Sequence, residues 1–429
     1  MNPIAKNMNE TLSKLNKNIL DMLSDTGKNI FMPKGILSQS AEAKEKAHKF
    51  NATIGISTSR GKPLYLKSMY EKFKDVNFES IFPYAPAAGV TELRNIWREK
   101  IIRDNPSLKN TQISLPIVSH ALTNGLATVG ELFINRGDYV VLPDMFWGNY
   151  RLMFGVRLGG ELATYKTFSD DGGYNVAGFL QTVRECGAQS KKVIVILNFP
   201  NNPSGYSLTK DEAKSLADGL TEIAESGINI VAVSDDAYFG LFFEDNIFKE
   251  SLFALLAGRS ERLLAVKTDG ITKESFAWGF RIGFITYGAT IEGNNDEILK
   301  VLEAKTTGFI RSTISSCSHP AQSIALETLK SPNFMKEKNE CGKIIEKRCL
   351  KVKEILNTMN YQDQFSPYPF NSGYFMCVKL AKIDAETLRT ALLDKYGIGV
   401  ISVNQTDIRI AFSSVDEENL QELFDTVYK

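Results

Sequence analysis

The run Val193-Ile-Val-Ile-Leu197, followed at once by Asn198-Phe-Pro-Asn-Asn-Pro-Ser-Gly205, decides the fold of this chain. Five consecutive apolar residues, mostly β-branched and without polar alternation, are typical of a strand that is buried on both faces of a sheet. Similar runs lie at residues 139–142, 228–233, 263–266 and 282–286, with helical patterns between them. Strands that alternate with helices form parallel crossovers. The sequence therefore predicts an α/β fold in which helices cover both faces of a mostly parallel sheet.

The length of the chain predicts more than one domain. Single hydrophobic cores stop growing at roughly 250–300 residues, and this chain has 429. We expect a large domain at residues 81–319 and a smaller α+β domain built from residues 51–80 and 320–429. A long helical pattern at residues 334–359 joins the two.

Residues 1–50 are expected to form an N-terminal helical arm. Its polar sequence carries one apolar stripe at three- and four-residue spacing, formed by Leu12, Leu15, Ile19 and Met22. Such a stripe marks the face that a helix buries, so we expect the arm to pack on another surface.

The charge and cysteine content narrow the class of function. The chain has 50 Lys+Arg and 50 Asp+Glu residues, so no net field favours binding to nucleic acid or to an anionic membrane. Its five cysteines form no CxxC pair, which is typical of free thiols in a reducing compartment. We find no signal-peptide pattern and no apolar run of the ~18 residues that span a membrane. These features predict a cytoplasmic protein that acts on small molecules.

Three polar motifs follow the predicted strands. One begins at Asn198, one is Asp235-Asp-Ala-Tyr238, and one contains Lys273. Ligands of parallel α/β sheets bind at the carboxyl ends of the strands. The three motifs are therefore predicted to meet in one site.

The side chains of these motifs match the groups that the ring of pyridoxal 5′-phosphate requires. Lys273 offers an amine that forms an imine once its pKa is lowered from the usual ~10.4 by burial or nearby positive charge. Asp235 offers a carboxylate that keeps a pyridine nitrogen protonated. Asn202 and Tyr238 offer hydrogen-bond donors for the ring oxygen. Taken singly, a solvated lysine, an aspartate helix cap or a turn asparagine is the commoner role, but the combination favours the cofactor.

A phosphate group is predicted to lie near the next motif. Arg281 stands between Gly279 and Gly283, where the missing side chains allow close approach to an anion. A guanidinium binds phosphate with two parallel donors. Alone, this motif is also compatible with a tight turn.

On these motifs the chain resembles fold type I pyridoxal-phosphate enzymes of the class I/II aminotransferase family, from about residue 51 to the C-terminus. The resemblance implies that Lys273 carries the cofactor and that Arg281 binds its phosphate. It also implies that Asn202, Asp235 and Tyr238 bind the ring.

Further segments extend the resemblance. Pro143-Asp-Met-Phe-Trp147-Gly-Asn149-Tyr150 is similar to the segment whose aromatic residue stacks on the cofactor, and its Trp-Gly-Asn is closest to the aspartate aminotransferase branch. The resemblance implies that Trp147 stacks on the ring and that Asn149 lies beside Asn202. Tyr84, in Tyr84-Ala-Pro-Ala-Ala-Gly89, corresponds to a tyrosine that reaches the phosphate of a neighbouring subunit, which implies a homodimer with shared sites.

The substrate side of the site is also implied by the resemblance. Arg409 occupies the place of the arginine that binds the substrate α-carboxylate, and Gly55 matches a glycine that faces the same group. Arg311 lies where the aspartate branch has an arginine for a side-chain carboxylate. An interface charge is an alternative role for Arg311, and an edge-strand charge for Arg409.

The chain departs from the family pattern at two places around the phosphate. The family often has a serine three residues before the lysine, and Gly270 stands there in this chain. We therefore expect Thr272 or other donors to bind the phosphate. The phosphate loop falls at Ala121-Leu122-Thr123, without its usual leading glycine or serine, and we assign Leu122 and Thr123 to it.

The resemblance implies a ping-pong transamination between an L-amino acid and a 2-oxo acid, with Lys273 as the imine-forming residue and proton carrier. Arg311 and Trp147 favour aspartate or another acidic amino acid, whereas Phe146, Tyr150, Tyr374 and Phe375 suit an aromatic one. β-Elimination and decarboxylation remain alternatives, because the same groups would hold the cofactor. A cofactor-sensing regulator is disfavoured, since the arm shows no helix-turn-helix-like basic pair.

Overall fold

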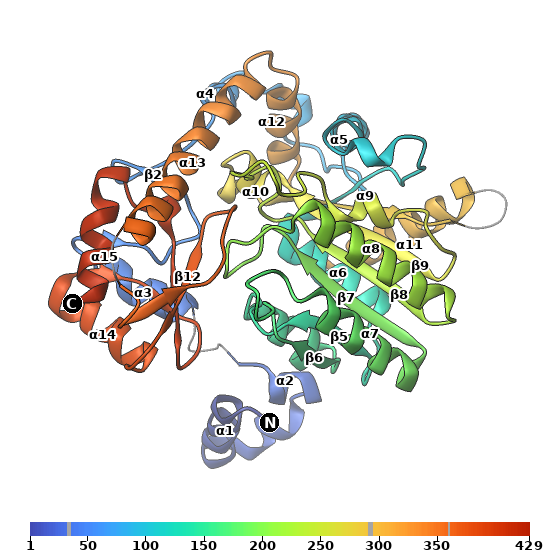
Figure 1. The fold of residues 1–429 in the computed structure, drawn as a ribbon. Coiled ribbons are helices and arrows are strands. Elements are labelled where there is room, and N and C mark those ends of the chain that lie inside the picture. Colours follow the sequence, from blue (N-terminus) through green and yellow to red (C-terminus); the bar gives the residue numbers. More distant parts are fainter. Residues whose placement is uncertain (32–35, 291–294, 359–360) are drawn as a thin grey trace.

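A seven-stranded sheet forms the centre of the large domain (Figure 1). The computed structural model describes residues 1–31, 36–290, 295–358 and 361–429. The strands follow the order β4-β10-β9-β8-β7-β5-β6. Their bounds are β4 Ile117–His120, β5 Tyr139–Pro143, β6 Glu161–Tyr165, β7 Lys192–Asn198, β8 Asn229–Asp235, β9 Leu263–Gly270 and β10 Ile282–Gly288. β5 to β9 are mutually parallel, and β10 is antiparallel to both β4 and β9.

Successive residues of β7 enter two different cores, one on each face of the sheet. Val193, Val195 and Leu197 belong to the core that includes residues of α7 (Val176–Ser190) and α8 (Lys210–Glu225). Ile194 and Ile196 belong to the core that includes residues of α6 (Ala121–Phe133) and α11 (Asn295–Thr313). A strand with both faces buried needs no polar alternation. The predicted α/β fold with helices on both faces is therefore confirmed.

The small domain is built around a four-stranded antiparallel sheet of order β11-β12-β15-β14. Its strands are β11 Phe365–Pro367, β12 Met376–Leu380, β14 Ile401–Ser402 and β15 Asp407–Ile410. The accompanying helices are α13 Phe334–Thr358, α14 Ala385–Tyr396 and α15 Leu420–Tyr428. The long helix predicted at residues 334–359 is α13, and its predicted last residue, Met359, lies outside the described residues. The chain also forms α4 Lys67–Lys72, α5 Thr91–Asp104, α10 Ile271–Glu274 and α12 His319–Leu329, while α9 Leu252–Leu256 packs against α8, β8 and β9.

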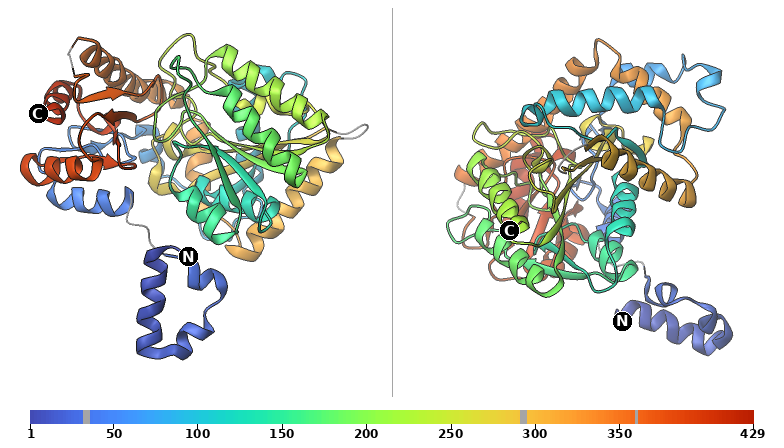
Figure 2. Two further views of the ribbon diagram at one scale, coloured as in Figure 1. Left: turned by 60° about the horizontal axis from the view of Figure 1, so that its bottom comes forward. Right: turned by 90° about the vertical axis from the view of Figure 1, so that its right-hand side faces the viewer.

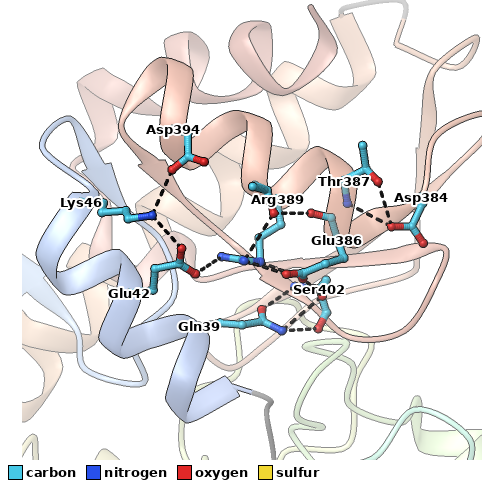
Figure 3. Close-up of polar contacts among 10 residues, drawn as sticks. Gln39, Glu42, Lys46, Asp384, Glu386, Thr387, Arg389, Asp394 and Ser402 are labelled. Atoms are coloured by element: carbon cyan, nitrogen blue, oxygen red, sulfur yellow. Dashed lines mark hydrogen bonds and ion pairs between the residues drawn. The ribbon is translucent and has the colours of Figure 1, made fainter.

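Helix α3 (Ile36–Lys46) is attached to the small domain by a polar network (Figure 3). Arg389 on α14 contacts Glu42 at 3.0 Å and Glu386 at 2.7 Å. Gln39 accepts a hydrogen bond from the backbone amide of Ser402 at 2.9 Å. Just after α3, β1 (Phe50–Asn51) pairs in parallel with β13 (Ile398–Gly399). The second half of the segment that we assigned to the arm thus lies against the C-terminal sheet.

The first half of the arm projects from the rest of the molecule (Figures 1 and 2). It consists of α1 (Pro3–Met22) and α2 (Asp25–Asn29), of which α2 contacts the π-helix η3 (Arg151–Arg157). Leu15 and Met22 are each 80% exposed. The predicted helix therefore forms, but its apolar stripe is not buried within this chain. No helix in the described ranges is apolar and long enough to cross a bilayer.

Candidate functional site

The ends of β7 and β8 bring the first two predicted motifs together. Asn198 and Asp235 are the last residues of these strands and are direct partners in the parallel register. The Asn198 side-chain amide donates to the Asp235 carbonyl at 2.9 Å, and its oxygen accepts from the Asn202 backbone amide at 2.8 Å. The Asn198 side chain therefore fixes the loop that contains Asn202 against the strand that ends in Asp235.

The carboxylate of Asp235 is buried and held by two donors. The Tyr150 hydroxyl donates to one carboxylate oxygen, and the Ala237 backbone amide donates to the other at 3.2 Å. Burial raises the pKa of Asp235 to about 6, although the Tyr150 hydrogen bond and the charge of Lys273 act in the opposite direction. An acid with this pKa is poised to pair with a cation that enters its pocket.

Tyr150 is a site residue that the sequence did not reveal in this role. We named it only among the aromatic residues that suit an aromatic substrate. Its hydroxyl reaches Asp235 across 85 positions of sequence, so no local pattern signals the contact. The segment that contains Trp147 was the available clue, because Tyr150 is its last residue.

Lys273 lies on the short helix α10, three residues after β9 ends at Gly270. Its Nζ is 5.1 Å from the centroid of the Tyr238 ring. Burial lowers the pKa of Lys273 to about 8, with a further contribution from Arg281, while Asp235 opposes the shift. A lysine with this pKa has a substantial neutral fraction at mildly alkaline pH, as a nucleophilic amine requires.

A tight cradle forms where β10 passes the start of α6. Gly283 pairs with Gly270 on one side and with Ser119 on the other. A Cβ atom at Gly283 would lie 2.7 Å from the Ala121 carbonyl carbon and 2.9 Å from the Leu122 nitrogen. The backbone of the predicted phosphate loop therefore needs glycine at position 283.

The same cradle explains both departures from the family pattern. A Cβ at Gly270 would lie 2.5 Å from the Ile282 carbonyl oxygen, so this backbone has no room for a serine at position 270. Ala121 has a φ of +59°, a left-handed conformation that glycine adopts most readily. Ala121, where the family pattern has glycine or serine, thus adopts a backbone conformation that is typical of glycine.

The remaining residues assigned to the phosphate lie around this cradle. The Thr272 hydroxyl is buried and has no hydrogen-bond partner in the described part of the chain. Leu122 is buried and Thr123 is exposed at the start of α6. Arg281 is half-buried and donates to the Trp278 carbonyl at 3.2 Å.

Arg409 is a buried cation without a carboxylate partner. It is 2% exposed and forms no ion pair with the described residues. Its guanidinium donates to the Asn202 side-chain oxygen at 3.0 Å and to the Thr53 carbonyl at 2.9 Å, and Nε has no partner among the described residues. Phe375 lies under the guanidinium at 4.1 Å. Burial of an uncompensated charge is costly, so this position favours an anionic ligand.

Asn202 links Arg409 to the ring-binding motifs. Since its side-chain oxygen accepts from Arg409, its side-chain NH₂ remains available as a donor. Tyr238 lies on the other side, with its ring 5.5 Å from that of Phe375. Gly55 is close to Phe375, because a Cβ at this glycine would lie 3.9 Å from the Phe375 ring.

Four further residues are assigned to the site by the resemblance. Trp147 is half-buried, with its ring 5.5 Å from that of Tyr150, and Asn149 is half-buried beside it. Tyr84 is 91% exposed. Arg311, at the end of α11, is exposed and donates to the Ser315 hydroxyl. Neither Tyr84 nor Arg311 is brought to the site of its own chain by these contacts.

The comparison of sequences places this chain in a family. Residues 49–427 match the family model of aminotransferases class I and II. The chain belongs to this family and is therefore an enzyme of the transferase class, as its motifs predicted.

Curated relatives and solved structures agree with this assignment. The chain is 27% identical over 340 residues to the probable aspartate/prephenate aminotransferase of Aquifex aeolicus, and the match covers 78% of each protein. The aspartate/prephenate aminotransferase of Cereibacter sphaeroides is also 27% identical, over 78% of this chain and 80% of that protein. An aminotransferase structure from Anaerococcus prevotii is similar with a TM-score of 0.83 at 23% identity, over 95% of this chain and 98% of that one. The aspartate aminotransferase of Thermus thermophilus with maleate matches with a TM-score of 0.72 at 21% identity, over 94% and 99%. The structural matches show the fold.

The cradle yields a prediction with an internal control. Gly283→Ala should lower the free energy of unfolding by about 1–3 kcal/mol, because the new methyl group overpacks against the backbone of residues 121 and 122. Gly279→Ala, in the same motif, should change it by less than about 0.5 kcal/mol, since no atom lies within 4 Å of its added Cβ. Urea unfolding of the cofactor-free proteins measures both. Equal effects at the two glycines would contradict the cradle.

Asp235 should make the stability of the cofactor-free protein depend on pH. Its pKa rises from the ordinary 3.8 to about 6 on folding, so the folded state binds the proton more tightly and stability falls as pH rises through this range. Asp235→Asn removes the effect. The stability of the variant relative to wild type should therefore increase by about 3 kcal/mol from pH 3.5 to pH 7. Denaturant titrations across this range test the sign, and a constant difference would show that the carboxyl is not perturbed.

Proposed function

We propose that this family member is a pyridoxal 5′-phosphate-dependent aminotransferase, which exchanges an amino group between an L-amino acid and a 2-oxo acid in two half-reactions. The observation that carries the proposal is the grouping of Lys273 with Asp235, Tyr238 and the uncompensated Arg409 at one edge of the sheet. The family match supports the same reaction.

The donor set fits the cofactor group by group. Asp235 is a buried acid that a protonated ring nitrogen would satisfy, and the free NH₂ of Asn202 and the Tyr238 hydroxyl can donate to the ring oxygen. The orphaned Thr272 hydroxyl, Arg281 and the backbone at Leu122 and Thr123 can receive the phosphate. The face of the Trp147 ring remains our candidate for stacking on the cofactor.

When bound, pyridoxal 5′-phosphate supplies an aldehyde that condenses with a primary amine with loss of water, and a protonated ring that withdraws electrons from the substrate Cα. Lys273 supplies the amine and then carries the proton to and from that carbon, a role that suits its pKa of about 8. Asp235 would hold the proton on the ring nitrogen, and the Tyr150 hydroxyl holds Asp235 in place.

Arg409 defines one end of the amino acid substrate. Its guanidinium would bind the α-carboxylate, because a planar fork of donors matches a carboxylate and the charge has no acidic partner among the described residues. Gly55, near Phe375, leaves room beside that group. Both the amino donor and the 2-oxo acid carry this carboxylate, so one arginine serves both half-reactions.

An acidic amino acid is our first candidate for the donor. Relatives of this chain carry the names aspartate and aspartate/prephenate aminotransferase. Arg311 is exposed and unpaired with any acidic side chain of the described residues, so it is available to a site in a second subunit. The second candidate is an aromatic amino acid, which Tyr374 and Phe375 would accommodate.

A homodimer with shared sites completes the proposal. The segment from residue 65 to residue 84 exposes six aromatic side chains, each more than half accessible: Tyr65, Tyr70, Phe73, Phe78, Phe82 and Tyr84. An exposed apolar patch of this kind marks an interaction surface. Tyr84 would then reach the phosphate of the second subunit. We retain the prediction of a cytoplasmic location, which the five free cysteines support.

A panel of amino donors with 2-oxoglutarate tests the reaction. We expect glutamate to form, with aspartate first among the donors, and the absorbance of the bound aldehyde form to fall as each good donor is added. Lys273→Ala should abolish both signals. Lys353→Ala should retain them, because Lys353 lies on α13 and is paired with Glu244. Release of ammonia or carbon dioxide in place of glutamate would identify β-elimination or decarboxylation instead.

Sedimentation tests the assembly separately. The wild-type protein should sediment as a dimer, and Phe82→Asp should shift it toward monomer because a charge in the apolar patch is costly to bury. Ile383→Asp is the control, since Ile383 is also exposed, at 43%, but lies in the small domain. A monomeric wild type, or dissociation by both variants, speaks against this surface.

A further inference from the structure

The residue after Lys273 points into a different buried cluster. Glu274 is 2% exposed. One of its carboxylate oxygens lies 2.6 Å from Nζ of Lys100, and the same oxygen pairs with Nζ of Lys338. Lys100 also pairs with Asp104 at 2.9 Å. We call these four residues the Glu274 junction.

Four segments of the chain meet at the junction. Lys100 and Asp104 lie on α5, Glu274 on α10, and Lys338 near the start of α13. The fourth segment is the loop that follows Tyr238. Gly240 in that loop has a φ of +84°, and a Cβ there would lie 3.5 Å from the Lys338 Nζ and 3.6 Å from the Glu274 Oε1.

The charges of the junction are mutually dependent. Burial would raise the pKa of Glu274, but Lys100 and Lys338 outweigh it and lower the pKa to about 2. Burial likewise disfavours the charge of Lys100, and Glu274 and Asp104 together outweigh that cost and raise its pKa. Removing one member of such a buried cluster leaves the others without compensation. The position of Glu274 is therefore fixed by strong forces from two helices.

Helix α10 needs an external anchor. It has only four residues, Ile271–Glu274, and no side-chain cap at its start, and a helix this short is not stable alone. The hydroxyls of Thr272 and Ser275 have no hydrogen-bond partners among the described residues. Among the described residues, α10 is attached to its surroundings by polar side-chain contacts of Glu274 and by the Tyr374 hydroxyl, which donates to the Lys273 carbonyl at 3.2 Å.

We propose that Glu274 is a positioning residue for Lys273: clamped between Lys100 and Lys338, it holds α10 so that the Lys273 amine stays beside Tyr238 and Asp235, where it can capture the cofactor. The inference rests on the proposed function. Glu274 is assigned no contact with substrate or cofactor. It acts on Lys273 through the backbone of α10.

Two ligands separate positioning of the amine from general binding. Pyridoxal 5′-phosphate carries the aldehyde with which Lys273 condenses, its C=O oxygen leaving as water as the C=N bond forms. Pyridoxine 5′-phosphate has the same ring and phosphate but a hydroxymethyl group in place of the aldehyde, so it cannot form this bond. Loss of amine positioning should weaken binding of the aldehyde alone.

Lys338→Met is the main variant, because Lys338 is the member on α13 and its side chain is 14% exposed. We expect its affinity for pyridoxal 5′-phosphate to fall about tenfold, with the affinity for pyridoxine 5′-phosphate within about twofold of wild type. Glu274→Gln, which leaves Lys338 without its carboxylate partner and Lys100 with Asp104 alone, should show a larger selective loss. Lys353→Met is the matched control on the same helix, because Lys353 pairs with Glu244 and not with a member of the junction, and it should bind both ligands as wild type does.

A measurement on the cofactor-free protein tests the same inference. Amide hydrogen exchange of residues 271–276 should accelerate in Lys338→Met and not in Lys353→Met. If Glu274→Gln does not fold, Lys338→Met still decides the question. Equal loss of affinity for both ligands, or unchanged affinity for both, overturns the inference. Failure of the wild-type protein to form a borohydride-fixed adduct at Lys273 would instead overturn the proposed function.

Discussion

The parallel pairing of β7, β8 and β9 is the constraint on which the site depends. Because these strands run in the same direction, their carboxyl ends meet at one edge and deliver Asn198, Asp235 and the start of α10 to one place. The strands are buried on both faces, and a polar side chain within them, such as Lys267, is paired inside the core, so the residues that face the site lie at the strand ends. The chemistry of the site is therefore concentrated by the same packing that stabilises the sheet.

At this edge of the sheet, one of two adjacent charged residues faces the site and the other faces the core. Asp235 faces the site, and its neighbour Asp236 accepts hydrogen bonds from Ser251 at 2.6 Å and from the buried Lys267. In the same way, Lys273 faces the site and Glu274 faces the buried ion pairs. The core-facing members have full ionic partners, whereas the site-facing ones are incompletely paired. Burial raises the pKa of Asp235 and lowers that of Lys273 because no full ionic partner offsets it at these two residues.

Much of this arrangement could be predicted from sequence, because it depends on local patterns. The strand runs preceded each motif, so the juxtaposition of Asn202, Asp235 and Lys273 followed from the rule for strand ends. Contacts between distant segments could not be predicted. The hydroxyl of Tyr150 on Asp235 and the carbonyl of Thr53 on Arg409 join residues whose spacing carries no signal. The left-handed backbone at Ala121 was hidden for another reason: alanine is not the residue that this conformation selects.

The small domain is assembled from both ends of the chain, since β1 pairs with β13 and α3 attaches to α14. By contrast, the large sheet is formed by the continuous stretch from residue 117 to residue 288. During synthesis, the large sheet can therefore condense while the C-terminal quarter is still on the ribosome. The Thr53 carbonyl can accept its hydrogen bond from Arg409 only after almost the whole polypeptide has emerged. Contacts between residues so far apart in the sequence form slowly in folding. A chain that ends before residue 330 could form the large sheet but would lack Lys338 and Tyr374, which hold α10, as well as Arg409, so the surroundings of Lys273 are completed only when the C-terminal segments have folded back.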